Sequence, residues 1–310
     1  MEPVTFQPLY MTRVWGGREF ERAYRRRLPE AHTPYGESWE IVDREKEQSV
    51  VDEGPLAGAA LHQLWTQRRE ALFGAGYEAH ARFPVLIKIL DARDDLSIQV
   101  HPRAANAGPD AEPKTEMWFI AGCDPGAKLY AGLKRGVTRA DFEQALADGS
   151  VAACVHAIEP RPGDSIFIPS GRLHAIGAGF LIHEIQQNSD TTYRVFDWNR
   201  AGLDGKPRQL HIDESLANID FDDIEPAIDA PHEGWLADCP WFRTERIRLQ
   251  AGATLANPDP EKFSIVSLID GTLESAGGRR FEKGRTLLLP RGVTPLKVMA
   301  GTDLLQITVP

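Results

Sequence analysis

Residues 161–174 read Arg-Pro-Gly-Asp-Ser-Ile-Phe-Ile-Pro-Ser-Gly-Arg-Leu-His and contain two turns around one short apolar run. The spacing is Gly163-x5-Pro169-x-Gly171-x2-His174. An apolar run of this length between glycine and proline turns is typical of a buried strand. The stretch therefore predicts a turn, a buried strand and a sharp corner that presents the imidazole of His174.

The same pattern recurs near the end of the chain. Residues 282–295 read Glu-Lys-Gly-Arg-Thr-Leu-Leu-Leu-Pro-Arg-Gly-Val-Thr-Pro, so Gly284, Pro290 and Gly292 repeat the spacing and Pro295 takes the place of His174. A repeat that keeps the turns but loses the imidazole predicts a second, degenerate barrel without a metal. One metal site per chain is expected.

Most of the remaining sequence predicts short strands separated by turn residues, as in an antiparallel β-barrel. A helical segment is expected near 56–80, with Leu61, Leu64, Trp65 and Leu72 on one face. A second helix is expected after Thr138, a capping residue, and before Gly149. The acidic, proline-containing stretch from 219 reads as a linker, so we expect domains at 1–218 and 219–310.

Composition excludes several classes of protein. The chain has 310 residues, of which 42% are hydrophobic and 26% charged, as in ordinary globular proteins. No apolar run is long enough to span a membrane, and the first residues do not resemble a signal peptide. The net charge of −10 with dispersed basic residues argues against nucleic-acid binding. Three widely spaced cysteines are expected to stay reduced, which fits a cytoplasmic protein.

Three side chains form a candidate metal site with His174. Gln99 and His101 alternate along one predicted strand, so they share a face, and Glu116 opens the next apolar run. Nitrogen and oxygen ligands without thiolates suit Zn²⁺, although Fe²⁺, Mn²⁺ or Co²⁺ also accept them. A single histidine in a strand is more often a satisfied core residue, but two histidines and a glutamate at this spacing favour a metal. Gln99 could ligate the metal or only form a hydrogen bond.

These segments resemble a known family. The spacing around His174 is the second motif of the cupin superfamily, whose fold is a jelly-roll barrel (double-stranded β-helix). Four segments, 99–102 (QVHP), 114–118 (KTEMW), 168–177 (IPSGRLHAIG) and 184–200 (EIQQNSDTTYRVFDWNR), are similar to short bacterial type I mannose-6-phosphate isomerases. Residues 14–17 (VWGG) and 35–41 (YGESWEI) extend the likeness, which runs from about residue 5 to 215. One departure from the general cupin pattern is Ala178, where an asparagine is usual.

The resemblance implies a mainly β protein with two cupin barrels and a small helical insertion. It implies one zinc ion held by Gln99, His101, Glu116 and His174, and an active-site arginine at Arg194. The implied reaction is the reversible conversion of mannose 6-phosphate to fructose 6-phosphate, with a small sugar phosphate as the only expected partner. The chain is expected to be a monomer or a weak homo-oligomer.

Isomerisation through a cis-enediol needs a base and stabilisation of negative charge. Glu184 and Lys114 are both candidates for the base, and the sequence leaves the choice open. Lys114 beside a metal is expected to have a disfavoured cationic form, or else to stay charged and hold an anionic oxygen. Arg194 is expected to act electrostatically, unless it only pairs with Asp197 or Asp190.

The sequence does not single out which residues bind the phosphate group of the substrate. Candidate contacts are Lys88, Arg172, Arg13 and Ser38, and no P-loop sequence is present. Two other functions stay open at this point: an iron-dependent cupin oxygenase, and a non-catalytic sugar-binding cupin. The polar strand at 186–192 favours a hydrophilic substrate, and the lack of a basic helical pair disfavours a regulator.

Overall fold

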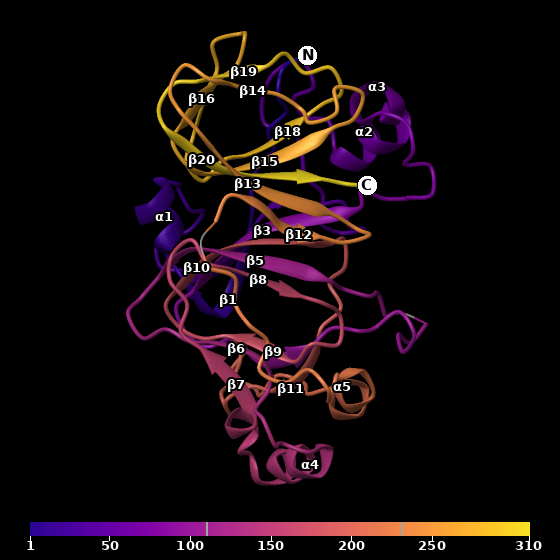
Figure 1. The fold of residues 1–310 in the computed structure, drawn as a ribbon, viewed down its shortest axis with the longest axis vertical. Helices are drawn as coiled ribbons and strands as arrows, with labels where there is room; N and C mark the ends of the chain where they lie inside the picture. The colour runs from indigo at the N-terminus through magenta and orange to yellow at the C-terminus, as the bar shows by residue number, and fades with distance from the viewer. Residues whose placement is uncertain (110, 231) are drawn as a thin grey trace.

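The computed structural model describes residues 1–109, 111–230 and 232–310, which form four sheets stacked in layers (Figure 1). All strand pairs within these sheets are antiparallel. The first sheet contains, in spatial order, β1 (Leu9–Gly17), β2 (Tyr35–Ile41), β3 (Val85–Ala92), β10 (Phe180–Gln187), β5 (Glu116–Cys123) and β8 (Ser165–Ile168). The second contains β11 (Tyr193–Phe196), β4 (Ile98–Val100), β9 (His174–Ile176), β6 (Leu129–Leu133) and β7 (Val155–Ile158).

The other two sheets use the C-terminal part of the chain. The third contains β12 (Gly234–Asp238), β13 (Arg243–Leu249), β20 (Thr302–Thr308), β15 (Ser264–Asp270) and β18 (Thr286–Leu289). The fourth contains β14 (Thr254–Leu255), β19 (Leu296–Val298), β16 (Thr272–Glu274) and β17 (Arg280–Glu282). The expected mainly β fold with two barrels is confirmed.

Each barrel is closed by apolar side chains from its two sheets. In the first barrel, Trp118, Ile168 and Ile182 of the first sheet pack with Leu129 and Ile176 of the second. In the second barrel, Leu287 and Leu289 of β18 and Leu304 of β20 pack with Leu273 of β16 and Leu296 of β19. Side chains alternate across a strand, so β5 and β10 send every second residue into the first barrel.

The opposite faces of β5 and β10 pack against the second barrel. Met117, Phe119 and Ile185 share one apolar cluster with Ile265 and Ile307 of the third sheet. This cluster places the first and third sheets next to each other in the middle of the stack (Figure 1). One face of β10 therefore belongs to the interior of the first barrel, and its other face belongs to the contact between the barrels.

The two sequence repeats occupy equivalent positions. The first forms β8, which pairs with β5, and the second forms β18, which pairs with β15. Gly163 and Gly284 precede these strands with φ of 95° and 80°, a left-handed conformation that favours glycine. His174 is the first residue of β9, whereas Pro295 directly precedes β19. The corner is thus retained in both barrels, and only the first carries an imidazole there.

The expected helix near 56–80 is two short helices, α2 (Leu61–Gln67) and α3 (Arg69–Phe73), and its predicted apolar face is buried. Arg68 leaves the helical conformation with φ of −133°, and Gly74 ends α3 at φ 91°. The break lets Trp65 and Phe73 pack edge-on at 4.9 Å between ring centroids. The predicted helical segment is therefore present but is broken at Arg68, because tertiary packing overrides local propensity.

The helix predicted after Thr138 is confirmed as α4 (Arg139–Asp148). Thr138 and Asp141 form a capping box, and Gly149 ends the helix at φ 78°. The remaining helical elements are α1 (Glu19–Tyr24), the 3₁₀ turn η1 (Val151–Ala153) and α5 (Ile212–Asn218). Helix α4 lies at the lower end of the stack in Figure 1, beyond the second sheet, and α5 lies beside β11.

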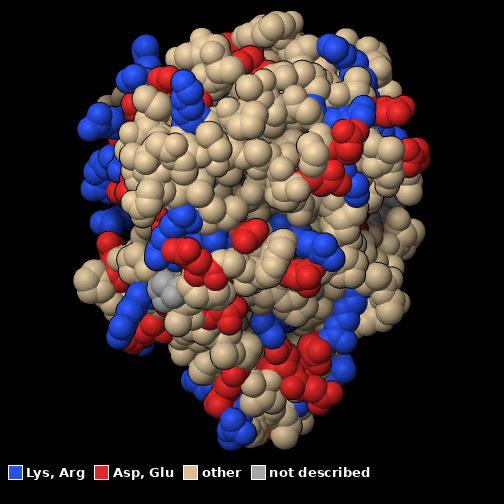
Figure 2. All heavy atoms as spheres, turned by 45° about the horizontal axis from the view of Figure 1, so that its top comes forward, with Lys and Arg blue, Asp and Glu red and all other residues tan. Residues whose placement is uncertain are grey.

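Charges of both signs are interspersed over the face drawn in Figure 2. Among the residues that the structure describes, no helix is both long and apolar enough to cross a membrane. With a net charge of −10, the chain has no overall attraction for anions. Any anionic ligand therefore needs cations gathered locally.

Candidate active site

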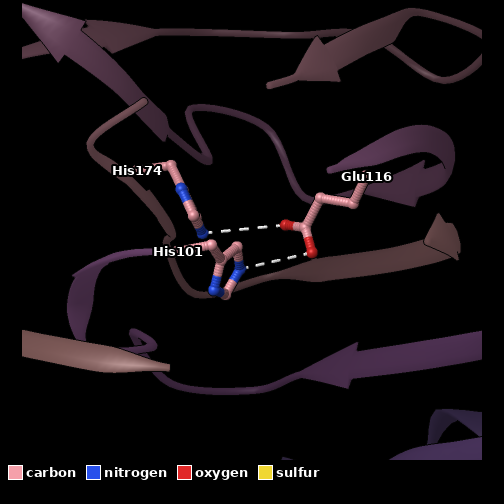
Figure 3. Close-up of side chains that lie close together, drawn as sticks. All are labelled: His101, Glu116 and His174. Atoms are coloured by element: carbon pink, nitrogen blue, oxygen red, sulfur yellow. Dashed lines mark ion pairs between the residues drawn. The ribbon is translucent and has the colours of Figure 1, made fainter. Parts of the chain in front are cut away.

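Three of the four predicted ligands converge at the end of the first barrel. His101 follows β4, Glu116 begins β5 and His174 begins β9, and one ligand atom from each lies within 4.8 Å of the others (Figure 3). Nε2 of His101 is 3.3 Å from Oε2 of Glu116, and Nε2 of His174 is 3.6 Å from Oε1. All three residues are at most 1% exposed.

Backbone carbonyls orient both imidazoles. Nδ1 of His101 lies 3.1 Å from the Thr191 carbonyl oxygen, and Nδ1 of His174 lies 2.9 Å from that of Arg172. A carbonyl only accepts, so each Nδ1 carries the hydrogen and each Nε2 presents a lone pair to the cluster. Burial lowers the pKa of both histidines, to about 3 for His101, so both rings are neutral.

One metal-ligating atom of this cluster has no hydrogen-bond partner. Among the described residues, none hydrogen-bonds to the buried Nε2 of His101, and the carboxylate of Glu116 has a single cationic neighbour, Nζ of Lys114 at 2.8 Å from its Oε2. Burying polar atoms without partners costs free energy. Neutral imidazole nitrogens and a carboxylate are ligands that zinc and related divalent metals accept. The residues present therefore fit a divalent cation, and the backbone bonds to Nδ1 are typical of metal-bound histidines.

Gln99, the fourth predicted ligand, lies beside the cluster. It is paired with His174 across β4 and β9, and its Nε2 is 3.2 Å from Nε2 of His174. The amide oxygen instead accepts a hydrogen bond from the Ser97 hydroxyl at 3.3 Å. In this orientation Gln99 hydrogen-bonds to His174, and a half-turn of its amide would bring the oxygen toward the cluster.

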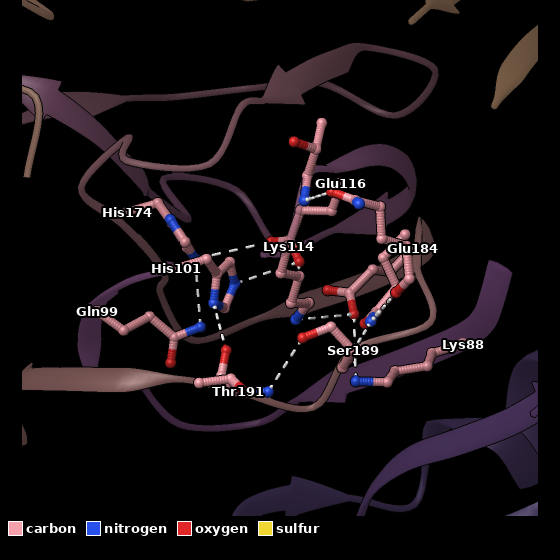
Figure 4. Close-up of polar contacts among 12 residues, drawn as sticks. Lys88, Gln99, His101, Lys114, Glu116, His174, Glu184, Ser189 and Thr191 are labelled. Carbon is pink, nitrogen blue, oxygen red and sulfur yellow. Dashed lines mark hydrogen bonds and ion pairs between the residues drawn. The ribbon is translucent and has the colours of Figure 1, made fainter. Parts of the chain in front are cut away.

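A row of alternating charges extends from the cluster into the barrel (Figure 4). Nζ of Lys114 is 2.8 Å from Oε2 of Glu116 and 3.9 Å from Oε1 of Glu184. On the other side, Nζ of Lys88 is 3.4 Å from the same Glu184 oxygen. The indole of Trp118 donates a hydrogen bond to Oε2 of Glu184 at 3.1 Å. All four charged side chains are at least nine-tenths buried.

Burial and neighbouring charges set the protonation of this row. Burial raises the pKa of Glu184, and repulsion from Glu116 raises it further. For Glu116 burial also raises the pKa, but Lys114 and His101 lower it well below the ordinary value. Burial lowers the pKa of Lys114, but the two carboxylates outweigh this and raise it above the ordinary value. Of the two alternatives that the sequence left open, this direction agrees with the one in which Lys114 stays charged, because Lys114 lies between two glutamates.

Arg194 lies on β11 and lines the same cavity, opposite Gln99 of β4. In the described part of the chain no carboxylate pairs with it, and Asp197 instead binds Arg200 and Arg208. Its Nη1 donates to the Gln209 carbonyl at 2.9 Å, while its Nε is buried without a partner. The alternative of an Arg194–Asp197 or Arg194–Asp190 ion pair is absent from the described residues.

These side chains surround a cavity of about 560 Å³, which is in the range of small-molecule sites. Its lining includes cations, carboxylates and aromatic rings drawn from both sheets of the first barrel. Among the lining residues are Arg13, Trp15, Glu37, Lys88, Gln99, Lys114, Trp118, His174, Glu184, Thr192, Arg194 and His211. His101 and Glu116 are buried behind this lining. The cavity therefore reaches two of the predicted metal ligands, Gln99 and His174, together with the predicted acid–base residues Lys114 and Glu184.

The four candidate phosphate contacts separate into two groups. Lys88 and Arg13 line the cavity. Arg172 is held by both carboxylate oxygens of Asp223, at 2.7 and 2.9 Å, and so has a structural partner. Ser38 is buried and donates to the Glu40 carboxylate at 2.5 Å, outside the cavity lining.

Two parts of the cavity wall were not predicted. Glu37 accepts two hydrogen bonds from the Arg13 guanidinium, at 2.9 and 3.1 Å, and one from Trp39 at 2.6 Å. Burial raises its pKa, but Lys88 and Arg13 bring it down to about 2. The alternation of Glu37 and Trp39 in YGESWEI could have indicated it. Residues 202–204, which also line the cavity, carry no comparable signal.

Comparisons with known proteins show which proteins the chain is similar to. A family model described as phosphomannose isomerase type I, catalytic domain, matches residues 4–117. The mannose-6-phosphate isomerase ManA of Bacillus subtilis (strain 168) is 36% identical over 310 residues, covering 96% of each chain. A mannose-6-phosphate isomerase of Streptococcus mutans is 32% identical over 307 residues, covering 94% of this chain and 93% of the relative.

A solved structure gives the same result for the fold. The crystal structure of the mannose 6-phosphate isomerase from Bacillus subtilis superposes with a TM-score of 0.86 and 28% identity, and covers 100% of both chains. The likeness to these relatives therefore includes both barrels. The chain belongs to the type I phosphomannose isomerase family.

Proposed function

We propose that this chain is a zinc-dependent aldose–ketose isomerase that interconverts mannose 6-phosphate and fructose 6-phosphate through a cis-enediol. The observation that carries the proposal is the buried cluster of His101, Glu116 and His174 beside the cavity that Glu184 and Lys114 line. Membership of the family supports the choice of substrate. The reaction needs an acid–base group and stabilisation of charge at two adjacent carbons.

His101, Glu116 and His174 would hold one zinc ion per chain, with Gln99 as a fourth ligand after rotation of its amide. A bound divalent cation supplies a Lewis acid that polarises substrate oxygens. The neutral imidazoles and the ionised Glu116 suit this role because their pKa values are lowered. The buried Nε2 of His101, which has no hydrogen-bond partner among the described residues, and its convergence with Glu116 and His174 support metal binding independently of the family.

We assign the role of base to Glu184. A carboxylate whose pKa is raised accepts a carbon-bound proton more readily near neutral pH than an ordinary glutamate does. The hydrogen bond from Trp118 and the ammonium of Lys88 hold its two oxygens in place. The carboxylate would take the proton from C2 or C1 and return it to the other carbon.

Lys114 and Arg194 then have electrostatic roles. The raised pKa of Lys114 keeps it cationic, which favours the alternative in which it holds an anionic oxygen. Arg194 has a buried Nε without a partner and is not engaged by a carboxylate among the described residues, so its charge is available to the enediolate. Lys114 is buried and Arg194 is partly buried, which strengthens the interaction of both cations with developing negative charge.

A metal-depletion experiment tests the proposal. The purified chain is stripped with a chelator, reloaded with Zn²⁺, and assayed for fructose 6-phosphate formed from mannose 6-phosphate. We expect activity to return as one metal binds per chain. His101→Ala and His174→Ala should lose both the metal and the activity, whereas the exposed His232→Ala is a matched control. A metal-loaded chain without activity would contradict the proposed reaction.

The same samples distinguish the alternatives. An iron-dependent oxygenase would need oxygen, so activity that persists under anaerobic conditions contradicts it. A non-catalytic sugar-binding cupin would bind mannose 6-phosphate without converting it. We further propose that the enzyme is cytoplasmic. We also propose that it is monomeric or weakly self-associating, and light scattering after size-exclusion chromatography measures this oligomeric state directly.

A further inference from the structure

The backbone of Arg194 is tied to one residue by two reciprocal hydrogen bonds. The Arg194 N–H donates to Nδ1 of His211 at 3.2 Å, and the His211 N–H donates to the Arg194 carbonyl at 2.8 Å. The carbonyl of Gln209, two residues before His211, accepts from Nη1 of Arg194 at 2.9 Å. Segment 209–211 therefore holds both the main chain and the guanidinium of Arg194.

The hydrogen bond to Gln209 matters because no other residue that the structure describes forms a hydrogen bond or ion pair with the Arg194 side chain. Burial and the neighbouring cation of Arg208 lower its pKa, so the charged form is not stabilised by its surroundings. The structure describes no ion pair for it, and its Nε is buried without a hydrogen bond. An arginine side chain has many rotamers, and fixing it toward the cavity costs conformational entropy.

His211 is itself firmly held. Its carbonyl accepts bonds from the amide of Ser215 at 2.9 Å and from the Ser215 hydroxyl at 2.5 Å, at the start of α5. Its ring lies against Tyr193 at 6.1 Å between ring centroids. The position of the imidazole is thus set by α5 and β11 together.

The two ring nitrogens of His211 face different tasks. A backbone N–H always donates, so Nδ1 of His211 must carry the lone pair. In the neutral ring the hydrogen is then on Nε2, and the ring forms part of the cavity wall. The His211 side chain contacts Arg194 through Nδ1, whereas a direct contact with substrate would use Nε2.

We propose that His211 is a positioning residue that acts through Nδ1 and holds Arg194 in the orientation required for isomerisation. The proposal rests on the role proposed above for Arg194. It assigns to the segment 209–211, outside the two sheets of the first barrel, a function in catalysis that neither the ligand cluster nor the acid–base residues explain.

Two conservative variants separate the roles of the nitrogens. In His211→Asn the side-chain amide oxygen takes the place of Nδ1, and in His211→Gln the amide reaches the place of Nε2. We expect His211→Asn to keep kcat within about threefold, and His211→Gln and His211→Ala to lower kcat by about 100-fold with a smaller change in KM, as for a misplaced active-site group. Retention by His211→Gln with loss by His211→Asn, or full activity in all three, overturns the proposal.

A double-mutant cycle supplies the second readout. If His211 acts through Arg194, adding His211→Ala to Arg194→Ala should cause no further loss of kcat, whereas independent roles would multiply the two losses. Full activity of Arg194→Ala would contradict both the role of Arg194 and the proposal. Bound zinc and thermal unfolding, measured on each variant, should be unchanged.

Crystal structures of the variants test the positioning without any activity. The Nη1–Gln209 bond should persist in His211→Asn and be lost in His211→Gln. If the wild-type chain proved inactive toward mannose 6-phosphate, the proposed function would fail while this structural result would still decide whether His211 orients Arg194. An unchanged Arg194 in His211→Gln overturns the positioning role.

Discussion

Gln99 and His174 are directly opposed partners on β4 and β9, with 3.2 Å between their side-chain nitrogens. The other neighbour of β4 places Arg194 opposite the same glutamine. One row across the second sheet therefore carries an arginine, an amide and an imidazole toward one cavity. Sheet register, rather than proximity in the sequence, brings these groups together.

Replacing Gln99 by alanine tests whether its amide ligates the metal. If the amide is a ligand or orients His174, Gln99→Ala should weaken zinc binding by about 10- to 100-fold, the usual effect of removing a group that orients a metal ligand. A competition titration against a chelator measures this affinity. The exposed Gln63→Ala on α2 is the control. Equal affinity for both variants would mean that Gln99 plays no part in holding the metal.

Replacing Glu184 by glutamine tests its role as the base. The variant keeps the shape and the acceptor for Trp118 but cannot take a proton, so kcat should fall by about 10²- to 10⁴-fold with little change in KM. Steady-state kinetics with mannose 6-phosphate measures both constants. Glu282→Gln, at an exposed position on β17, should be fully active. A loss of less than tenfold in Glu184→Gln would assign the proton transfer to another group.

The pH dependence of the wild-type enzyme follows from the same residue. A base must be ionised, and burial raises the pKa of Glu184. Activity should therefore be present at pH values above this raised pKa and fall as the pH decreases through it. The acidic limb of kcat/KM should lie above the ordinary glutamate pKa of about 4.3 and disappear in Glu184→Gln. A limb at or below the ordinary value would not agree with a buried base.

Asp91 should make folding stability depend on pH. Burial raises its pKa from 3.8 to about 6, although the Glu19 N–H donates to it. A carboxyl with a raised folded-state pKa contributes stability below pH 3.8, and that stability is lost as the pH rises through 6. Asp91→Asn should avoid this loss, on the order of 2–3 kcal/mol.

Denaturant titrations at pH 4 and pH 7 measure the effect of Asp91. The free energy of unfolding of Asp91→Asn minus that of the wild type should be larger at pH 7 than at pH 4, which means that the substitution stabilises the protein more at pH 7. The exposed Asp222→Asn should show no such change. A difference that is equal at both pH values would mean that Asp91 titrates normally.

Arg26 should stabilise the folded protein through contacts with both barrels. Its guanidinium forms two bonds with the Glu40 carboxylate, at 2.7 and 3.0 Å, and a third with the carbonyl of Gly284 in the second barrel. Because Glu40 is only 5% exposed, Arg26→Met would leave a buried carboxylate without its partner. We expect a loss of about 3–5 kcal/mol in the free energy of unfolding.

The double variant Arg26→Met, Glu40→Leu provides the comparison. Removing both charges avoids the unpaired carboxylate, so much of the lost stability should return. Chemical unfolding of the three proteins measures the difference. If the single and double variants are equally unstable, the cost comes from lost packing rather than from the unpaired charge.

Much of the fold could be predicted from local pattern. The Pro/Gly corner of residues 163–174 and its copy at 284–295 identified two equivalent strands, and the capping residues identified α4. These features depend on neighbours within a few residues, because turn chemistry and capping are local. The break between α2 and α3 could not be predicted, because it depends on aromatic packing around Trp65 from distant segments.

By itself, the sequence determined which residue types were available for the site: imidazoles, carboxylates and cations at strand positions of one barrel. Only the tertiary structure decided how they are charged and oriented. The direction of the Lys114 pKa depends on two glutamates, one of them from β10, and the orientation of Arg194 depends on His211 at the start of α5. Both depend on through-space distances between segments far apart in the chain, and electrostatic and hydrogen-bond energies follow those distances.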